Sequence, residues 1–309
     1  MPERVPPPNA RGGTLTTPIE FGISITPTWR ETDEVVRLAQ VADEAGLDLI
    51  GIQDHPYQWR FFDTWTVIAH LAARTSRIRF FPDVANLPLR PPAVLAKAAA
   101  SLDVLTGGRV ELGLGAGGFW DAVEAMGGPR RTPRQAVEAA EEALDVIRLM
   151  WSGDRGVRYE GHHYRLSGVH TGPKPAHDMG IWVGAGGPKM LDLIGRKADG
   201  WVPSEPWAPV EELPRYLARI EGAAVEAGRD PGSIRRVYNL MGSIEPATSE
   251  RFRGRFPIGS RSSAGPSRSG WTRSSSGPPE MIASDRSRRS PPMSPRPFGR
   301  PPRRVGDRA

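Results

Sequence analysis

Two hydrophobic patterns alternate along the first 245 residues of the chain. Short runs that are almost continuously apolar, such as 19–25 and 47–52, are typical of strands buried on both faces. Longer segments between them carry apolar residues at helical spacing. In the segment 32–45, Asp33 and Glu34 also suit the positive end of a helix dipole. This alternation predicts a parallel sheet with right-handed helical crossovers.

The pattern predicts seven strands and about six long helices, with a hairpin around Gly161 as an excursion. A barrel of eight βα units needs about 250 residues, so the count predicts an α/β barrel that lacks its last unit. We expect the strands in 19–25, 47–52, 78–85, 109–115, 181–187, 199–204 and 235–244, and the helices in 32–45, 64–74, 91–106, 133–151, 188–198 and 209–227.

The pattern ends at about Ile244. Residues 246–309 contain no Leu, and Arg, Ser, Pro and Gly supply 45 of the 64, so we expect this tail, like residues 1–18, to lack a fixed structure. One hypothesis is that the tail is an out-of-frame translation of a GC-rich gene. The other is a basic tail that binds nucleic acid, but the tail has no Lys, and nucleic acid is therefore the less favoured partner.

Charge and composition exclude several classes of protein. The tail carries a net charge of +10 against +6 for the whole chain, so residues 1–245 carry −4 and are mildly acidic. The chain has no Cys, which excludes disulfides, thiolate metal sites and cysteine nucleophiles. It also has no apolar run of spanning length or secretory h-region, so we expect a cytoplasmic protein without a membrane partner.

Two glycine-rich segments follow predicted strands. Residues 113–118 match G-x-G-x-x-G, but no helix begins at the last glycine and no acid ends a following strand, so we reject a dinucleotide-binding fold. These glycines instead suggest a backbone that lies close to something flat or bulky. Residues 184–187 precede Pro188 at the start of a predicted helix, which suits a phosphate. A tight βα turn would explain the same glycines.

Asp54 and His55 end the second predicted strand, where barrel enzymes place their chemistry. A polar loop after a strand is the simpler explanation. The chain has no Gly-x-Ser-x-Gly motif and no His or acidic residues at metal-ligand spacing, so we expect no metal site.

These segments, taken in order, resemble the bacterial-luciferase-like family of flavin- and deazaflavin-dependent oxidoreductases. The resemblance rests on "VVRLAQVADEAGLDLIGIQDH", "NLPLRPPAVLAKAAASLDVLTGGRVELGLGAG", "YEGHHYRL" and "PKPAHDMGIWVGAGGPKMLDLIGRKADGWV", and it covers residues 19–244. It implies a TIM barrel with FMN or coenzyme F420 (a 5-deazaflavin) at the carboxyl ends of the strands. The last βα unit of the family is not recognisable in this sequence.

The resemblance also implies roles for individual residues. Asp54, His55 and Trp59 match the family's Asp-His pair and the Trp five residues after the Asp. His55 would move a proton, with Asp54 orienting it, and Trp59 would keep water from the hydride path. Cofactor contacts would come from three segments: Val84, Ala85 and Asn86, where relatives often have a non-proline cis peptide; Gly115 and Ala116; and Gly184, Ala185, Gly186 and Gly187.

One departure from the family changes the expected substrate. Sugar-phosphate dehydrogenases of this branch carry a catalytic Glu at the position of Ala116 or Gly117, whereas the first carboxylate here is Asp121. We therefore expect hydride transfer or monooxygenation on a larger, more apolar small molecule, which Phe61, Phe62, Phe119 and Trp120 would suit. We also expect a homo-oligomer. The alternative is a non-functional relative with an unclosed barrel.

Overall fold

The computed structural model describes residues 19–205 and 207–241. Its central element is a set of short parallel strands, and an antiparallel hairpin lies apart from them. The hairpin consists of β6 (Val157–Glu160) and β7 (Arg165–Val169). The parallel strands are β1 (Gly22–Ile25), β2 (Leu49–Ile52), β3 (Arg79–Pro82), β4 (Ala85–Asn86), β5 (Leu112–Gly115), β8 (Ile181–Gly184), β9 (Gly200–Trp201) and β10 (Arg235–Arg236).

The parallel strands follow the order of the chain. β1, β2 and β3 are neighbours in one group, and β10, β9, β8, β5 and β4 in the other. A parallel bridge between Phe80 and Val110 joins β3 to the residues just before β5. β4 follows β3 directly along the chain and continues its path. The resulting order, β1-β2-β3-β5-β8-β9-β10, is that of a TIM-type barrel. The seven predicted strands are confirmed, and the third of them is split.

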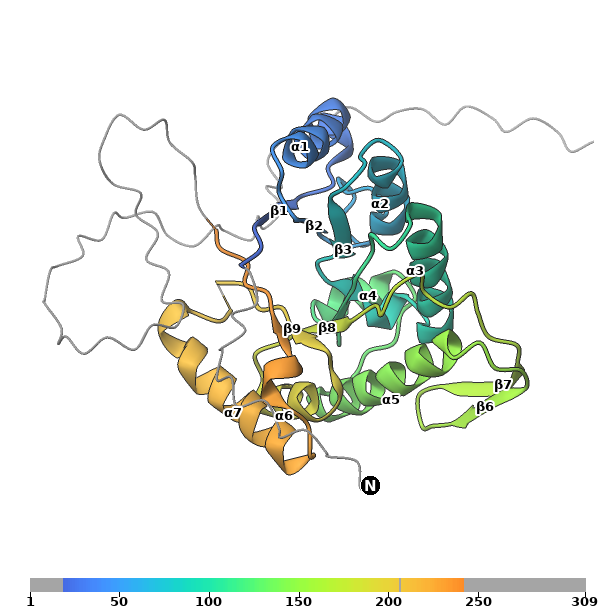
Figure 1. Ribbon diagram of the computed structural model, residues 1–309. Coiled ribbons are helices and arrows are strands. Elements are labelled where there is room, and N and C mark those ends of the chain that lie inside the picture. The colour runs from blue at the N-terminus through green and yellow to red at the C-terminus, as the bar shows by residue number, and fades with distance from the viewer. Residues whose placement is uncertain (1–18, 206, 242–309) are drawn as a thin grey trace, which may run out of the picture. The chain divides into compact units, whose positions relative to one another are not determined.

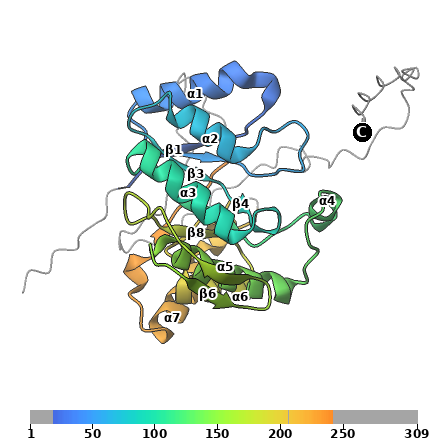
Figure 2. The same cartoon turned by 90° about the vertical axis from the view of Figure 1, so that its right-hand side faces the viewer.

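Helices cover the outside of the strands, as Figures 1 and 2 show. The six predicted helices are present, and the described residues add a seventh, short helix in the glycine-rich loop after β5. The long helices are α1 (Thr32–Glu44), α2 (Thr64–Ala72), α3 (Pro92–Thr106), α5 (Pro133–Trp151), α6 (Pro188–Lys197) and α7 (Leu213–Glu226), and the short one is α4 (Trp120–Ala125).

Local sequence signals set the helix ends. α5 begins with a capping box, in which the hydroxyl of Thr132 accepts from the backbone N–H of Gln135 and the Gln135 side chain accepts in return from the backbone N–H of Thr132. Pro133 then occupies the first helical position, where its missing N–H costs no hydrogen bond. α3 ends at Gly107, whose φ of 70° is left-handed and favours glycine.

The hairpin is tied to α5 by one carboxylate. The side chain of Glu142 on α5 accepts hydrogen bonds from three successive backbone N–H groups in the hairpin turn, those of His162, His163 and Tyr164. Three charge-assisted bonds satisfy donors that a tight turn would otherwise leave exposed. The hairpin is therefore anchored to the outer layer, away from the carboxyl ends of the strands.

The first and last strands of the described barrel are linked by side chains. The carboxylate of Glu20, just before β1, forms ion pairs with Arg79 on β3 and Arg235 on β10. Nearer the carboxyl ends of the strands, the carboxyl group of Asp83 accepts hydrogen bonds from Ser24 Oγ on β1 and Asn239 Nδ2 after β10. Within residues 19–241, no strand lies between β10 and β1, so these polar contacts bridge the seam.

The proposed flexible segment 1–18 and the basic tail 246–309 lie outside the described residues. No described helix is both long enough and apolar enough to cross a membrane.

Candidate functional site

The cofactor residues proposed from the sequence meet at the carboxyl ends of three adjacent strands. Asn86 on β4 lies in register with Gly115 on β5, and Gly115 lies in register with Gly184 on β8. These residues span almost 100 positions of the sequence, yet they form one row across the sheet. The carboxyl ends of parallel barrel strands are where such enzymes bind their ligands.

Val84 fills the space beside this row because its neighbours are glycines. A Cβ atom on Gly115 would lie 2.8 Å from Cγ2 of Val84, and one on Gly184 would lie 3.0 Å from the same atom. The peptide bond between Asp83 and Val84 is cis, at the position that the family resemblance indicates. The glycines therefore allow the side chain of Val84 to form the floor of the row.

Asn86 is held by its backbone and has an unused side-chain acceptor. Its N–H donates to Oδ2 of Asp54 at 2.8 Å, and the residue is only 7% exposed. Its Oδ1 atom is buried and has no hydrogen-bond partner in the structure. A buried acceptor without a donor costs about 1–3 kcal/mol. A ligand that carries an N–H or O–H group would relieve this cost.

Asp54 does not orient His55, contrary to the expectation from sequence. Its carboxylate is almost fully buried and binds the guanidinium of Arg90 through Nε at 2.7 Å and Nη2 at 2.8 Å. The third contact is the Asn86 N–H. These partners occupy both oxygens, and Asp54 thus positions the strand that carries Asn86. In the sequence, Arg90 lies in the segment "NLPLRPPAV", which carries part of the family resemblance but indicates no role for this arginine.

His55 is held by Tyr57 in an aromatic pocket. Nδ1 of His55 lies 2.7 Å from Oη of Tyr57. The rings of Tyr57, Phe61 and Phe119 have centroids 5.5–6.2 Å from that of His55. Burial lowers the pKa of His55, against the opposing charge of Asp54. The charge of Asp54 favours imidazolium, but desolvation outweighs it and favours the neutral ring.

Tyr57 was missed in the sequence. Burial, helped by the negative charge of Asp54, raises the pKa of Tyr57 to about 12, so its phenol stays protonated at neutral pH. The only signal for it was its place between His55 and Trp59 in the loop after β2.

Phe119 reaches the site from the loop after β5. Its backbone φ of 50° is left-handed, which is uncommon for a bulky residue and is found mainly where surrounding structure enforces it. The ring lies edge-on to His55 and is 57% exposed, so it forms an outer apolar wall. Ala116 lies in the same loop, while the carboxylate of Asp121 is exposed and pairs with Arg130. The described loop thus brings no acid to His55.

Trp59 lies on the surface, where it does not form the expected wall beside His55. It is 62% exposed and packs against Trp29, whose indole N–H donates to the Trp59 carbonyl oxygen. The guanidinium groups of Arg30 and Arg60 lie 5.2 and 5.0 Å from its ring centroid. Phe61 and Phe119 take the place that the sequence suggested for Trp59.

The second glycine-rich segment has the geometry of an anion site. Gly187 is the N-cap of α6 and Pro188 follows at its first position. Backbone N–H groups in the first turn of a helix have no intrahelical partner, and the dipole adds positive potential. A Cβ atom on Gly187 would meet nothing within 4 Å, so the approach is open. Ala185 contributes its carbonyl oxygen to the indole N–H of Trp201, and Gly186 follows it.

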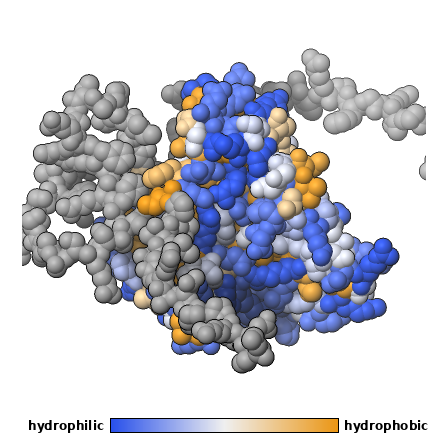
Figure 3. Space-filling view, in the orientation of Figure 1, coloured by the Kyte–Doolittle hydropathy of each residue, from blue (hydrophilic) through white to orange (hydrophobic). Residues whose placement is uncertain are grey.

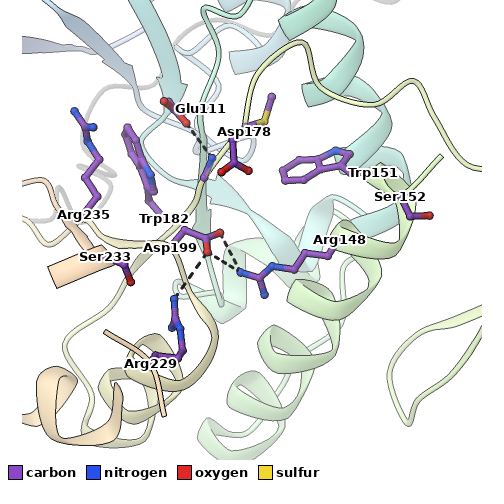
Figure 4. A pocket seen from close by; sticks show the side chains of 12 residues that line it. Glu111, Arg148, Trp151, Ser152, Asp178, Trp182, Asp199, Arg229, Ser233 and Arg235 are labelled. Carbon is purple, nitrogen blue, oxygen red and sulfur yellow. Dashed lines mark hydrogen bonds and ion pairs between the residues drawn. The ribbon is translucent and has the colours of Figure 1, made fainter. Parts of the chain in front are cut away.

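A hollow lies at the opposite end of the strands (Figure 4). It has a volume of about 550 Å³, and its lining residues Gly180 and Asp199 directly precede β8 and β9. Its main charges already pair with one another, as in the contacts of Arg148 with both Asp199 oxygens at 3.0 Å. We therefore place the functional site at the carboxyl ends. Among the described residues, no group of three His, Asp or Glu could hold a metal ion.

Comparison with known proteins identifies the family. Residues 10–253 match the luciferase-like monooxygenase family. The chain belongs to the luciferase-like monooxygenase family. It is 31% identical to the F420-dependent hydroxymycolic acid dehydrogenase of Mycobacterium tuberculosis, covering 79% of this chain and 66% of that protein. It is 30% identical to an F420-dependent glucose-6-phosphate dehydrogenase of Nocardia farcinica, covering 74% of this chain and 69% of the relative.

Solved structures agree with this assignment. The coenzyme F420-dependent tetrahydromethanopterin reductase of Methanopyrus kandleri is 26% identical and superposes with a TM-score of 0.64, covering 72% of this chain and 65% of that chain. This luciferase-like chain thus spans slightly less than two thirds of the reductase, and about two thirds of the mycobacterial relative.

The residues of this luciferase-like chain fit a flat ring with an attached phosphate. Three observations carry the fit: the floor at Val84, the unpaired acceptor of Asn86 beside it, and the open glycine turn at the start of α6. The glycines leave room for Val84, and a ring would lie against Val84 rather than in the space of the missing side chains. These are the groups that would hold such a cofactor at the carboxyl ends of the strands.

Proposed function

We propose that this chain is a flavin- or deazaflavin-dependent oxidoreductase that acts on a small apolar alcohol or carbonyl compound. The observation that carries the proposal is the row Asn86-Gly115-Gly184, with its buried unpaired acceptor, next to the His55 pocket. Hydride transfer is the favoured reaction. Monooxygenation, with oxygen as co-substrate, is the alternative within the same family.

The cofactor is FMN or coenzyme F420. Val84, Ala85 and Asn86 would lie against the ring, Gly115 and Ala116 would border its edge, and Gly184 to Gly187 would receive the phosphate. The names of the two curated relatives, both F420-dependent dehydrogenases, favour the deazaflavin. A bound flavin or deazaflavin would accept or supply the hydride.

The residues of the chain would handle the proton and exclude water. His55 would exchange a proton with the substrate oxygen, because its imidazole lies among the aromatic rings and can both donate and accept a proton. Asp54 would act at a distance, by fixing the Asn86 backbone and holding Arg90. Phe61 and Phe119 would limit access of water to His55. Trp59 would line the entrance rather than the reaction centre.

The apolar substrate class follows from what surrounds His55. Its neighbours are rings, and the described loop after β5 supplies Ala116 where a sugar-phosphate dehydrogenase would supply Glu. A phosphate ester or polyol would leave its polar groups unpaired against these rings. The mycobacterial relative named for hydroxymycolic acid is compatible with an apolar substrate, whereas the relative named for glucose 6-phosphate is the competing case.

Turnover with defined substrates tests the proposal. The full chain would be mixed with reduced coenzyme F420 or reduced FMN and with cyclohexanone, and cofactor oxidation would be followed by absorbance. Glucose 6-phosphate with oxidised cofactor serves as the second substrate. We expect turnover with the ketone alone. Turnover with glucose 6-phosphate alone would contradict the substrate class, and no turnover together with no cofactor binding would contradict the proposed function.

Two further expectations stay proposals. The homo-oligomer is supported by exposed apolar residues that flank β1 and β10, namely Ile19, Phe21, Leu240 and Met241. Figure 3 shows similar hydrophobic patches among the hydrophilic residues of one face. Light scattering after size exclusion would give the mass, and a monomer would contradict the expectation.

The cytoplasmic location also stays a prediction. The two alternatives, a defective open barrel and a nucleic-acid-binding tail, depend on residues outside the described part.

A further inference from the structure

The hydrogen bond between Tyr57 and His55 determines where the imidazole carries its proton. Oη of Tyr57 lies 2.7 Å from Nδ1 of His55, and no other hydrogen bond of this hydroxyl is present in the described residues. If Nδ1 carried the proton, the phenolic hydrogen would have no protein partner among the described residues. If the phenol donates to Nδ1, both groups are satisfied, and the imidazole proton resides on Nε2.

The surroundings of the pair keep both groups neutral. Asp54 is the charged group next to His55, and its carboxylate is bound by Arg90, which also pairs with Asp63 at 2.6 Å. The other neighbours of His55 are the rings of Phe61 and Phe119, which carry no charge. Burial lowers the pKa of His55 and raises that of Tyr57, so the neutral imidazole and the neutral phenol coexist over a wide range of pH.

We propose that Tyr57 and His55 form a two-step proton relay that equips the site to reduce carbonyl groups. This inference rests on the proposed function. As the carbonyl carbon gains a hydride, its oxygen takes the proton from Nε2 of His55, and Nδ1 takes the proton from Oη of Tyr57. The imidazole is then neutral with its proton on Nδ1, and Tyr57 is a phenolate. Solvent gives one proton to Nε2 as Nδ1 returns its proton to Oη, which restores the starting state. Each turnover therefore delivers one proton to the alkoxide and takes one proton from solvent.

The relay differs from a lone histidine in its dependence on pH. A lone His55 can donate only as imidazolium, so the rate of carbonyl reduction would fall about tenfold per pH unit above the pKa of His55. With Tyr57 behind it, the neutral imidazole can donate, and the rate stays level through neutral and mildly alkaline pH. Asp54 and Arg90 take no part in the proton transfer and affect this pair only through their charges and positions.

Two measurements test the relay on the full chain. The first is nitrogen NMR of 15N-histidine-labelled protein without cofactor, with the His55 signal assigned by its loss in His55→Gln. We expect protonated Nε2 and unprotonated Nδ1 in the natural sequence, and a mixture of tautomers in Tyr57→Phe. The control is Tyr164→Phe, which removes a phenol that contacts Arg131 instead of His55. Protonated Nδ1 in the natural sequence would overturn the proposal.

The second measurement is the single-turnover rate of cyclohexanone reduction by the reduced cofactor from pH 6 to pH 9. We expect a level profile for the natural sequence and for Tyr164→Phe, and a fall of about tenfold per pH unit for Tyr57→Phe. Equal profiles for Tyr57→Phe and the natural sequence would overturn the relay. Failure of the proposed function would look different, because cofactor binding would be absent while the His55 tautomer stayed as expected.

Discussion

Arg90 holds the carboxylate of Asp54 through two parallel hydrogen bonds, Nε to Oδ2 at 2.7 Å and Nη2 to Oδ1 at 2.8 Å. The bidentate geometry suits a guanidinium and would not suit a lysine. Through its third contact, the Asn86 N–H, this ion pair connects the loop after β2 to the strand at the cofactor face. Asp54 is therefore a positioning residue.

Replacing Arg90 with Leu should destabilise the fold strongly. The change would leave the buried Asp54 carboxylate without its counter-charge, which typically costs about 3–5 kcal/mol. Thermal unfolding would show a lowered Tm, and Arg90→Lys should recover only part of the loss. The control is Arg37→Leu, because Arg37 pairs with Glu34 on the exposed face of α1. Equal effects of the two Leu substitutions would contradict the role of Arg90.

A methyl group on Gly115 should disturb the cofactor face. The new Cβ atom would lie 2.8 Å from Cγ2 of Val84, which must then move, and overpacking of this kind typically costs about 1–3 kcal/mol. Gly115→Ala should weaken binding of FMN or coenzyme F420 by at least about tenfold, which is 1.4 kcal/mol. Fluorescence titration would measure it.

Gly222→Ala is the matched control for Gly115→Ala. Gly222 lies within α7, and a Cβ atom there would meet nothing within 4 Å. Alanine is favoured over glycine in a helix by up to about 1 kcal/mol, so this variant should unfold at a slightly higher temperature and bind the cofactor normally. Normal cofactor binding by both variants would contradict the assigned role of Gly115.

Asp83→Asn should change how stability depends on pH. Burial raises the pKa of Asp83, against the hydrogen bonds from Asn239 and Ser24. The folded chain therefore binds the proton more strongly than the unfolded chain, whose Asp has a pKa of about 3.9. The free energy of unfolding should fall as the pH rises from that value through the raised pKa of the folded state. Asn cannot ionise, so the variant should lose this decline.

Urea unfolding at several pH values from 4 to 8 measures this difference. The stability of Asp83→Asn relative to the natural sequence should increase as the pH rises. Asp121→Asn, at an exposed carboxyl group, controls for the general loss of one negative charge. A difference between Asp83→Asn and the natural sequence that is constant across this range would contradict the burial effect.

Phe119→Asn should separate stability from substrate binding. Asn tolerates the left-handed backbone that residue 119 adopts, at a φ of 50°. The substitution should therefore leave Tm unchanged or raise it, while loss of the apolar wall should lower kcat/KM for an apolar ketone by about tenfold. A lower Tm together with an unchanged kcat/KM would show that Phe119 serves the fold and not the site.

Most of the fold could be predicted from the sequence, because buried parallel strands and amphipathic helices leave different periodicities. The bounds of α5 were predicted to the residue, since Thr132 and Pro133 give a strong start signal. α4 was missed because six residues between glycines show too little periodicity. The split after Pro82 was not predicted, although Pro82 and Asp83 interrupt the apolar run 78–85.

The sequence proposes where the site lies, but the contacts between its residues could not be derived from it. The glycine-rich strand ends indicated a backbone that another group approaches closely, because glycine has no side chain to prevent such an approach. By contrast, the ion pair between Asp54 and Arg90 joins residues 36 positions apart. The hydrogen bond between His55 and Tyr57 depends on the path of the loop 53–63. The surface position of Trp59 also depends on its contact with Trp29, which comes from the loop after β1.

The most direct test of the central claim is a titration of the purified chain with coenzyme F420 and with FMN, followed by fluorescence and by thermal unfolding. We predict saturable binding of one cofactor with a raised Tm, because a ligand that binds only the folded state stabilises it. We further predict that Gly115→Ala weakens this binding while Gly222→Ala does not. Binding of neither cofactor would contradict the proposal that the carboxyl ends of β4, β5 and β8 form a cofactor site.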